Sequence, residues 1–119
     1  MYFFNPQHQE AFHALVAKYK KSSDNEYMSA FYILSTDTEI RHKTDKHVTY
    51  TGIDWEGIWQ YDWSSGYRLI LELGETLFKS SGSFELAQGL NTWDEYRFEV
   101  AMQAIRIRKN GLTSAKIVI

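Results

Sequence analysis

The sequence predicts a mainly α-helical fold, a compact single-domain bundle of about four to five helices spanning residues 1–119. Three observations predict it. Apolar side chains recur at the i, i+3, i+4, i+7 spacing of one helical face. The chain has one proline and seven glycines, and 44% of it is hydrophobic. A chain of this length and composition can bury one core without help from disulfides.

The first helix is predicted to begin at Asn5-Pro6. The Asn5 side chain can accept a hydrogen bond from a free backbone N–H at the helix start, and proline suits the first helical position. This helix is expected to end near Lys21, and one apolar face repeats along it at Phe12, Leu15, Val16 and Tyr19.

A second helix is expected after the polar stretch 22–25, which offers new capping side chains. It is strongly apolar and therefore expected at the centre of the core, through Tyr27, Met28, Phe31, Tyr32 and Leu34.

The stretch 35–65 has a weaker pattern. It contains one short helix candidate, Asp37 to His42, and a β-leaning piece, His47 to Thr51, before Gly52. The tail from Leu112 ends in Lys-Ile-Val-Ile and could pair as a strand with Val48 to Thr51. A small two-stranded β element is therefore part of the prediction.

A further helix follows Ser64 or Ser65, either of which can act as its cap. Gly74 within it lowers helix propensity by about 1 kcal/mol relative to alanine, so we expect a neighbouring helix to approach closely there. The helix is expected to end in the stretch 79–83, and its apolar side is formed by Leu69, Ile70, Leu73, Leu77 and Phe78.

The last helix is predicted from Thr92 and Glu95, whose spacing allows reciprocal capping of the helix start. Asn110-Gly111 is a typical helix stop. The apolar stripe between these signals consists of Phe98, Ala101, Met102 and Ile105.

Composition excludes several classes of protein. The chain has no cysteine, which rules out a disulfide scaffold, a thiolate nucleophile and a cysteine-ligated zinc site. The net charge of −2 lacks the basic excess of proteins that bind nucleic acid through its phosphates. The sequence has neither a long apolar run nor a basic leader, so we expect no membrane partner and a cytoplasmic location.

The four histidines give no metal-site pattern. His8 and His13, like His42 and His47, are five residues apart, which places them on different faces of a helix. We therefore expect surface or helix-capping histidines and no metal. Nucleotide-binding glycine loops and a serine-nucleophile elbow are also absent, so we assign no catalytic residue and no cofactor.

The segment from Asp54 to Trp63 holds three of the four tryptophans. A helix would stack Trp55, Trp59 and Trp63 on one side, whereas a strand would align Trp59, Tyr61 and Trp63. Exposed rings would form a ridge suited to a protein partner, and the interleaved acidic residues would disfavour a polyanion. The alternative is that the rings pack into the core.

Three stretches carry a resemblance: Tyr2-Phe3-Phe4-Asn5-x-x-His8, Leu77-Phe78-Lys79-Ser80-Ser81-Gly82 and Gly89-Leu90-Asn91-Thr92-Trp93. This pattern resembles a family of uncharacterised small proteins of Firmicutes bacteria and their phages, which includes a staphylococcal protein. The similarity spans about Tyr2 to Asn110 and is weakest between Glu39 and Trp63. It implies a helical fold and a phage or prophage origin, and it transfers no activity. Asn5 and His8 then mark a helix start or a shared binding site.

The leading functional hypothesis is a non-enzymatic protein-binding module, encoded by a phage or prophage, that modulates or inhibits a host protein. Its candidate binding residues are Trp55, Trp59, Tyr61, Trp63, Asn5 and His8. One alternative is a small hydrolase or nuclease, which would need His8, His42, Asp45 or His47 to converge in space with carboxylates. Another is a self-assembling structural protein that uses Ile117-Val118-Ile119 as an edge strand, and a homodimer is compatible with the sequence.

Overall fold

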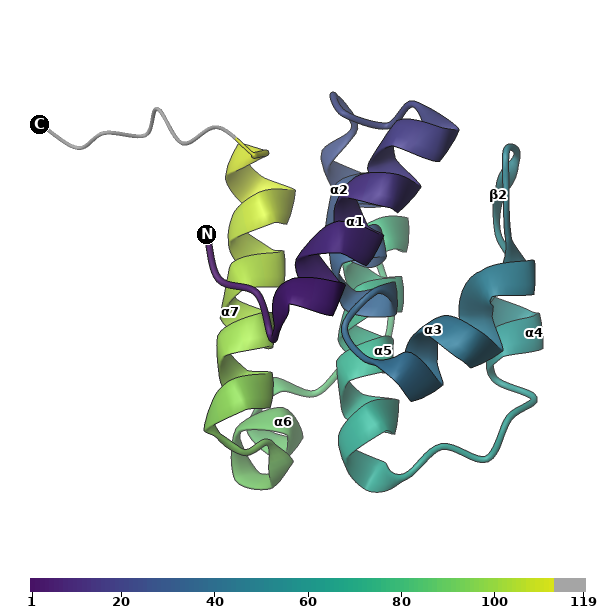
Figure 1. The fold of residues 1–119 in the computed structure, drawn as a ribbon. Coiled ribbons are helices and arrows are strands. Elements are labelled where there is room, and N and C mark those ends of the chain that lie inside the picture. Colours follow the sequence, from purple (N-terminus) through teal and green to yellow (C-terminus); the bar gives the residue numbers. More distant parts are fainter. Residues whose placement is uncertain (113–119) are drawn as a thin grey trace, which may run out of the picture.

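The computed structural model describes residues 1–112 as a helical bundle with one small β-hairpin (Figure 1). Its α-helices are α1 (Pro6–Tyr19), α2 (Asn25–Leu34), α3 (Thr38–Thr44), α4 (Trp55–Ile58), α5 (Ser65–Lys79), α6 (Leu86–Thr92) and α7 (Glu95–Asn110). The predicted mainly helical fold with a small β element is confirmed. None of the helices in this part of the chain is long and apolar enough to cross a bilayer.

Helix α2 is the centre of the core. It packs against α5 and α7, and α1 covers another of its sides (Figure 1). Every residue from Met28 to Leu34 is buried, which matches a helix that is apolar around most of its circumference. The predicted central place of this helix is confirmed.

Helix α1 begins as predicted. Asn5 is extended, and its Oδ1 accepts a hydrogen bond of 2.8 Å from the backbone N–H of His8. Pro6 occupies the first turn, where its missing N–H costs nothing. The helix ends at Tyr19 because Lys20 adopts the left-handed conformation that closes many helices.

The hairpin lies between α3 and α4. A 3₁₀ turn (Asp45–His47) leads into β1 (Val48–Thr49), which pairs antiparallel with β2 (Gly52–Ile53). Val48 lies opposite Ile53. The β-leaning piece thus pairs with the residues that directly follow it. The predicted pairing with the C-terminal tail concerns residues 113–119, which lie outside those described.

The predicted start of the last helix is wrong. Thr92 is the final residue of α6, and α7 is capped by Asp94, whose Oδ1 accepts a 2.8 Å hydrogen bond from the N–H of Arg97. The backbone N–H of Trp93 is bonded to the carbonyl of Gly89 at 2.9 Å, which completes a separate turn. Local capping at Asp94 therefore replaces the Thr92–Glu95 arrangement.

Gly74 marks a close approach between helices, as predicted. A Cβ atom at this position of α5 would lie 3.3 Å from Cγ2 of Ile33 on α2 and 3.5 Å from the Trp55 ring. The absent side chain lets α5 pack tightly on the central helix, which offsets the propensity cost of glycine.

Candidate functional site

A series of half-buried rings links the hairpin region to the start of α5. His47, Tyr61, Trp63 and Tyr67 follow one another in edge-to-face contacts, with ring centroids 5.7, 5.9 and 6.2 Å apart. We call these four residues the aromatic row. Each ring packs on its neighbour with its electron-poor edge toward a face, the geometry that aromatic pairs prefer.

Cationic side chains lie against the aromatic row. Lys43 Nζ is 5.0 Å from the Trp63 ring centroid, and Arg97 Cζ is 4.8 Å from that of Tyr67. Both cations are also paired with carboxylates: Lys43 with Glu39 at 3.0 Å, and Arg97 with Asp94 at 3.4 Å. Lys46 Nζ, 6.0 Å from the Tyr61 ring centroid, is the cation beside the row that forms no ion pair within residues 1–112. One unpaired cation is far from the basic surface that a polyanion needs.

The tryptophan segment is neither one helix nor a strand. Helix α4 covers only Trp55–Ile58, and the chain leaves the helical path after Trp59. Trp59 Nε1 donates to Glu75 Oε1 at 2.9 Å, and Trp63 Nε1 donates to the Ile58 carbonyl at 2.8 Å. Because both indole donors are engaged inside the chain, a partner could contact these two residues only through their rings.

Trp55 belongs to the core. It is 3% exposed and packs 6.1 Å from Phe78, with its ring edge over Gly74. Trp59, Tyr61 and Trp63 are half-buried. Trp55 is therefore a core residue, whereas Trp59, Tyr61 and Trp63 are partly exposed.

His8 is fully buried, so the expectation of a surface histidine is wrong for this residue, whereas its ring does bind a backbone N–H at the start of α1. Its Nδ1 accepts a 3.0 Å hydrogen bond from the Phe4 N–H, which places the ring proton on Nε2 for donation to the Tyr32 carbonyl at 2.7 Å. Burial lowers the pKa of His8 to about 4, although the bond to Tyr32 opposes this shift. His8 and the capping residue Asn5 therefore fix the start of α1, as the helix-start interpretation of these two residues expects.

The residues of the hydrolase alternative do not gather into one site. His42 and Asp45 line an open pocket of about 360 Å³ with Thr38 and Arg41. His47 instead faces Asp54 at 3.3 Å and the Tyr61 hydroxyl at 3.3 Å, and His8 lies in the core. Within residues 1–112, no three histidine or carboxylate side chains are placed to hold a metal ion.

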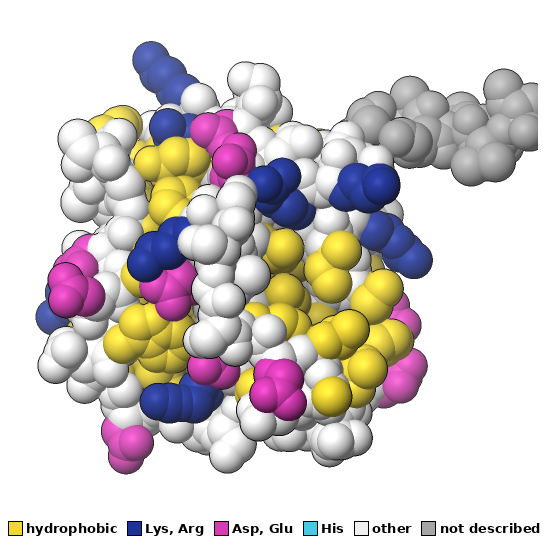
Figure 2. Space-filling model, turned by 180° about the vertical axis from the view of Figure 1, so that it is seen from behind, with side chains coloured by type: hydrophobic (Ala, Val, Ile, Leu, Met, Phe, Trp, Pro, Cys, Tyr) yellow, Lys and Arg dark blue, Asp and Glu magenta, His cyan; other side chains and the backbone are white. Residues whose placement is uncertain are grey.

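Helix α6 exposes two leucines that the sequence analysis missed. Leu86 is 51% exposed and Leu90 is 52% exposed, one helical turn apart. We call this pair the α6 ridge. Figure 2 shows hydrophobic side chains gathered at the lower right of the back face, at the end of the molecule formed by α6 and α7. The i, i+4 spacing of the leucines was the signal that could have revealed the ridge.

The inner side of α6 explains why its leucines point outward. Gly89 packs against the Trp93 ring so closely that a Cβ atom would lie 2.6 Å from it. Trp93 is in turn stacked on Phe84, with centroids 5.7 Å apart and ring planes inclined by 12°. The glycine and the tryptophan fill the contact with the rest of the fold, so α6 buries neither leucine.

Acidic residues flank the α6 ridge in the chain. Glu85 is the residue directly before α6, and Glu95 opens α7. Both are exposed, and neither forms an ion pair in the described part of the chain. The nearby cation Arg97 is already paired with Asp94 and Asp37. On another side of α6, Arg68 of α5 lines a pocket with Gln88 and Asn91, so the unpaired carboxylates lie at the two ends of the helix and a cation lies beside it.

Comparison of this chain with protein-family models, with curated proteins and with solved structures finds no match. The functional proposal accordingly depends on the geometry of the residues described above.

Proposed function

We propose that this chain is a non-enzymatic protein-binding module whose main contact surface is the α6 ridge. The observation that carries the proposal is the half exposure of Leu86 and Leu90 on one short helix. Full burial of a leucine side chain is worth about 1.5–3 kcal/mol, so a partner that covers both would gain a useful part of its binding free energy there.

The charges near the ridge indicate the chemistry of the partner. Glu85 and Glu95 are exposed and unpaired within residues 1–112. A protein that presents apolar side chains flanked by lysine or arginine would complement both the leucines and the carboxylates. A second copy of this chain would bring like charges together at the same surface, which disfavours self-association through it.

The half-exposed aromatic residues support the same function at a second surface. Trp59, Tyr61 and Trp63 belong to residue types that are enriched at binding hot spots. Their support is weaker than that of α6, because both indole N–H groups are already bonded inside the chain. The resemblance to Firmicutes and phage proteins favours a host protein in the bacterial cytoplasm as the partner.

A displayed library of amphipathic helical peptides with basic, neutral or acidic flanks tests this proposal. The wild-type chain should select apolar peptides with basic flanks. Leu86→Gln/Leu90→Gln should lose that selection while its unfolding transition stays unchanged, since neither side chain is part of the core. Gln88→Ala, an exposed change on the same helix, is the matched control and should select the same peptides as wild type.

Two outcomes would overturn the proposal. One is equal selection by the wild-type chain and the double leucine variant. The other is a preference for acidic flanks, which the carboxylates of Glu85 and Glu95 disfavour. Sedimentation equilibrium of both proteins adds a separate check, because a wild-type dimer that the double variant abolishes would show that α6 pairs with a second copy.

A further inference from the structure

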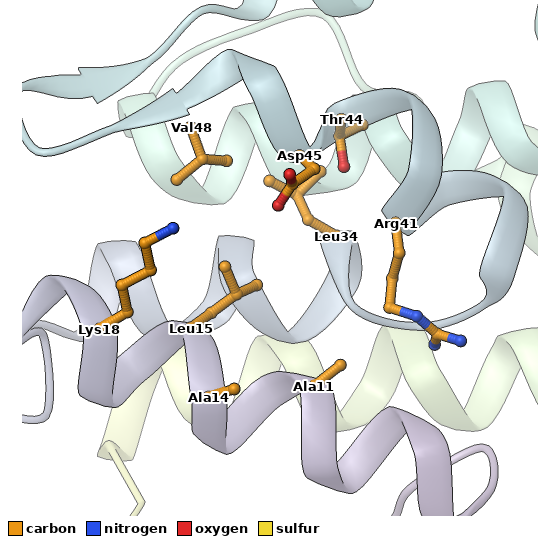
Figure 3. A pocket seen from close by; sticks show the side chains of 9 residues that line it. All are labelled: Ala11, Ala14, Leu15, Lys18, Leu34, Arg41, Thr44, Asp45 and Val48. Carbon is orange, nitrogen blue, oxygen red and sulfur yellow. The ribbon is translucent and has the colours of Figure 1, made fainter.

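A second candidate site lies between α1 and α3, away from the α6 ridge (Figure 1). Both helices pack on α2, and the space left between them is a half-open pocket of about 230 Å³. Its apolar lining comes from three elements: Ala11, Ala14 and Leu15 of α1, Leu34 at the end of α2, and Val48 of β1 (Figure 3).

Small side chains on α1 keep this pocket open. Ala11 and Ala14 are one turn apart and lie at the α1 side of the cavity (Figure 3). Larger residues at these positions would fill the space, as they do elsewhere in a close-packed interior. The resulting surface is apolar and concave, which is the usual character of a small-ligand site.

Three charged side chains that form no ion pair within residues 1–112 line the pocket: Lys18, Arg41 and Asp45. The Lys18 amine comes from α1 and the Asp45 carboxylate from the end of α3, so the two charges approach the cavity from its two walls, near Val48 (Figure 3). Neither group forms an ion pair with any residue of the range 1–112. A ligand can therefore use both charges without breaking an ion pair, although it competes for the Lys18 ammonium with the Tyr19 ring, whose centroid lies 5.2 Å from Nζ.

The other polar groups of the pocket are already engaged. The Arg41 guanidinium donates to the Ser35 carbonyl at 2.9 Å and to Thr38 Oγ1 at 3.2 Å, and it points away from the cavity (Figure 3). Thr44 Oγ1 donates to the Ile40 carbonyl at 2.7 Å. Lys18 and Asp45 are thus the side chains that would bind the charged groups of a ligand.

We propose that this pocket binds an apolar α-amino acid. The side chain of the ligand occupies the space lined by Ala11, Ala14 and Leu34, its carboxylate pairs with Lys18, and its ammonium pairs with Asp45. The size is suitable, because a cavity of about 150 Å³ already accommodates benzene. The pair of opposite charges favours a zwitterion over a fatty acid or an amine, each of which would leave one charge of the pocket unmatched.

Titration of the ¹⁵N-labelled protein with L-leucine and L-phenylalanine tests the proposal by the chemical shifts of its backbone amides. Saturable shifts are expected at Ala14, Leu15 and Val48, with a Kd of about 1 mM, which is reasonable for so small a ligand. Glycine lacks the apolar body, isocaproate lacks the ammonium, and isoamylamine lacks the carboxylate. Each of these three probes should bind more weakly than leucine.

Variants locate the site. Ala14→Phe should fill the cavity and abolish the saturable shifts, and Ala11→Met provides a second filling variant if the first does not fold. Lys18→Gln and Asp45→Asn should each weaken leucine binding about two- to fivefold, the range expected for solvent-accessible ion pairs. Lys46→Gln changes an exposed lysine that does not line the pocket and should leave the affinity unchanged.

Three results would each overturn the assignment: no saturable shift with either amino acid, unchanged binding in both filling variants, or isocaproate binding as tightly as leucine. The test is independent of the α6 proposal, because none of these substitutions touches α6 and none of the probes is a protein.

Discussion

His8 Nε2 donates a 2.7 Å hydrogen bond to the carbonyl oxygen of Tyr32, which joins the first turn of α1 to the last turn of the central helix. Nδ1 of the same ring accepts from the Phe4 N–H at 3.0 Å. A buried neutral imidazole thus holds three segments of the chain together. Protonation of Nδ1 would place a second donor against the Phe4 N–H, so the fold selects the neutral ring.

This arrangement predicts a loss of stability in mild acid. The pKa of His8 is lowered by burial from 6.5 to about 4 in the folded chain, so the unfolded chain binds the proton more tightly. The His8 contribution is fully present above pH 6.5 and is lost as the pH falls toward 4, by up to about 3 kcal/mol. Urea unfolding at several pH values should show this slope.

Replacement of the histidine provides the control for that slope. His8→Asn should flatten the pH dependence of the unfolding free energy between pH 6.5 and 4, whatever its effect on stability at pH 7. His13→Asn changes an exposed histidine on the same helix and should keep the wild-type slope. A wild-type slope in His8→Asn would contradict the assignment.

The start of α1 provides a second prediction. Asn5→Ala removes the acceptor for the His8 N–H and should lower the free energy of unfolding by about 1 kcal/mol. Asn5→Asp keeps a side-chain oxygen at the same place and should retain most of the stability. Equal losses in the two variants, measured by urea unfolding, would show that the capping bond is not the cause.

The contact between Gly89 and Trp93 predicts a site that tolerates no added methyl group. Gly89→Ala should cost about 1–3 kcal/mol, because its Cβ would lie 2.6 Å from the Trp93 ring. Gly66→Ala is the matched helical control. Its nearest neighbour is the flexible Arg97 side chain at 3.9 Å, so it should gain up to about 1 kcal/mol from helix propensity. Thermal unfolding measures both effects, and a shift of the unfolding temperature in the same direction for both variants would contradict the prediction.

Tyr19 of α1 contacts the hairpin through its hydroxyl and through its ring, whose centroid is 4.8 Å from that of Tyr50. Tyr19 Oη donates to the Val48 carbonyl at 3.1 Å, in a buried contact. Tyr19→Phe should therefore cost about 1 kcal/mol and speed hydrogen exchange at the amides of β1 and β2. Tyr27→Phe removes a hydroxyl that makes no hydrogen bond within residues 1–112, so its exchange pattern should match wild type. Unchanged exchange in Tyr19→Phe would mean that the ring alone holds the hairpin.

Helices with strong local signals were predictable. Asn5-Pro6 determines the start of α1 because a capping side chain and a restricted φ act within one turn. The apolar run of α2 determines its central place, since such a helix has no polar face to leave in water. The same local reasoning failed at Thr92, where two capping candidates stand two residues apart and the turn closed by Trp93 favours Asp94.

The candidate sites were less predictable, because exposure and convergence depend on the whole fold. Trp55 and Trp59 look equivalent in the sequence, yet one packs over Gly74 and the other is half-buried with its indole bonded to Glu75. The pocket between α1 and α3 brings Lys18 near Asp45, two residues on different elements, and no sequence motif predicts that proximity.

By itself, the sequence determined the helical class, the capping of α1 and the central role of α2, because periodicity and capping act over one or two turns. Only the tertiary structure decided that His8 is buried, that Leu86 and Leu90 are exposed, and that two opposite charges line an apolar pocket. The physical reason is that burial and side-chain proximity follow from which helix faces meet, and that depends on contacts between residues far apart in the chain.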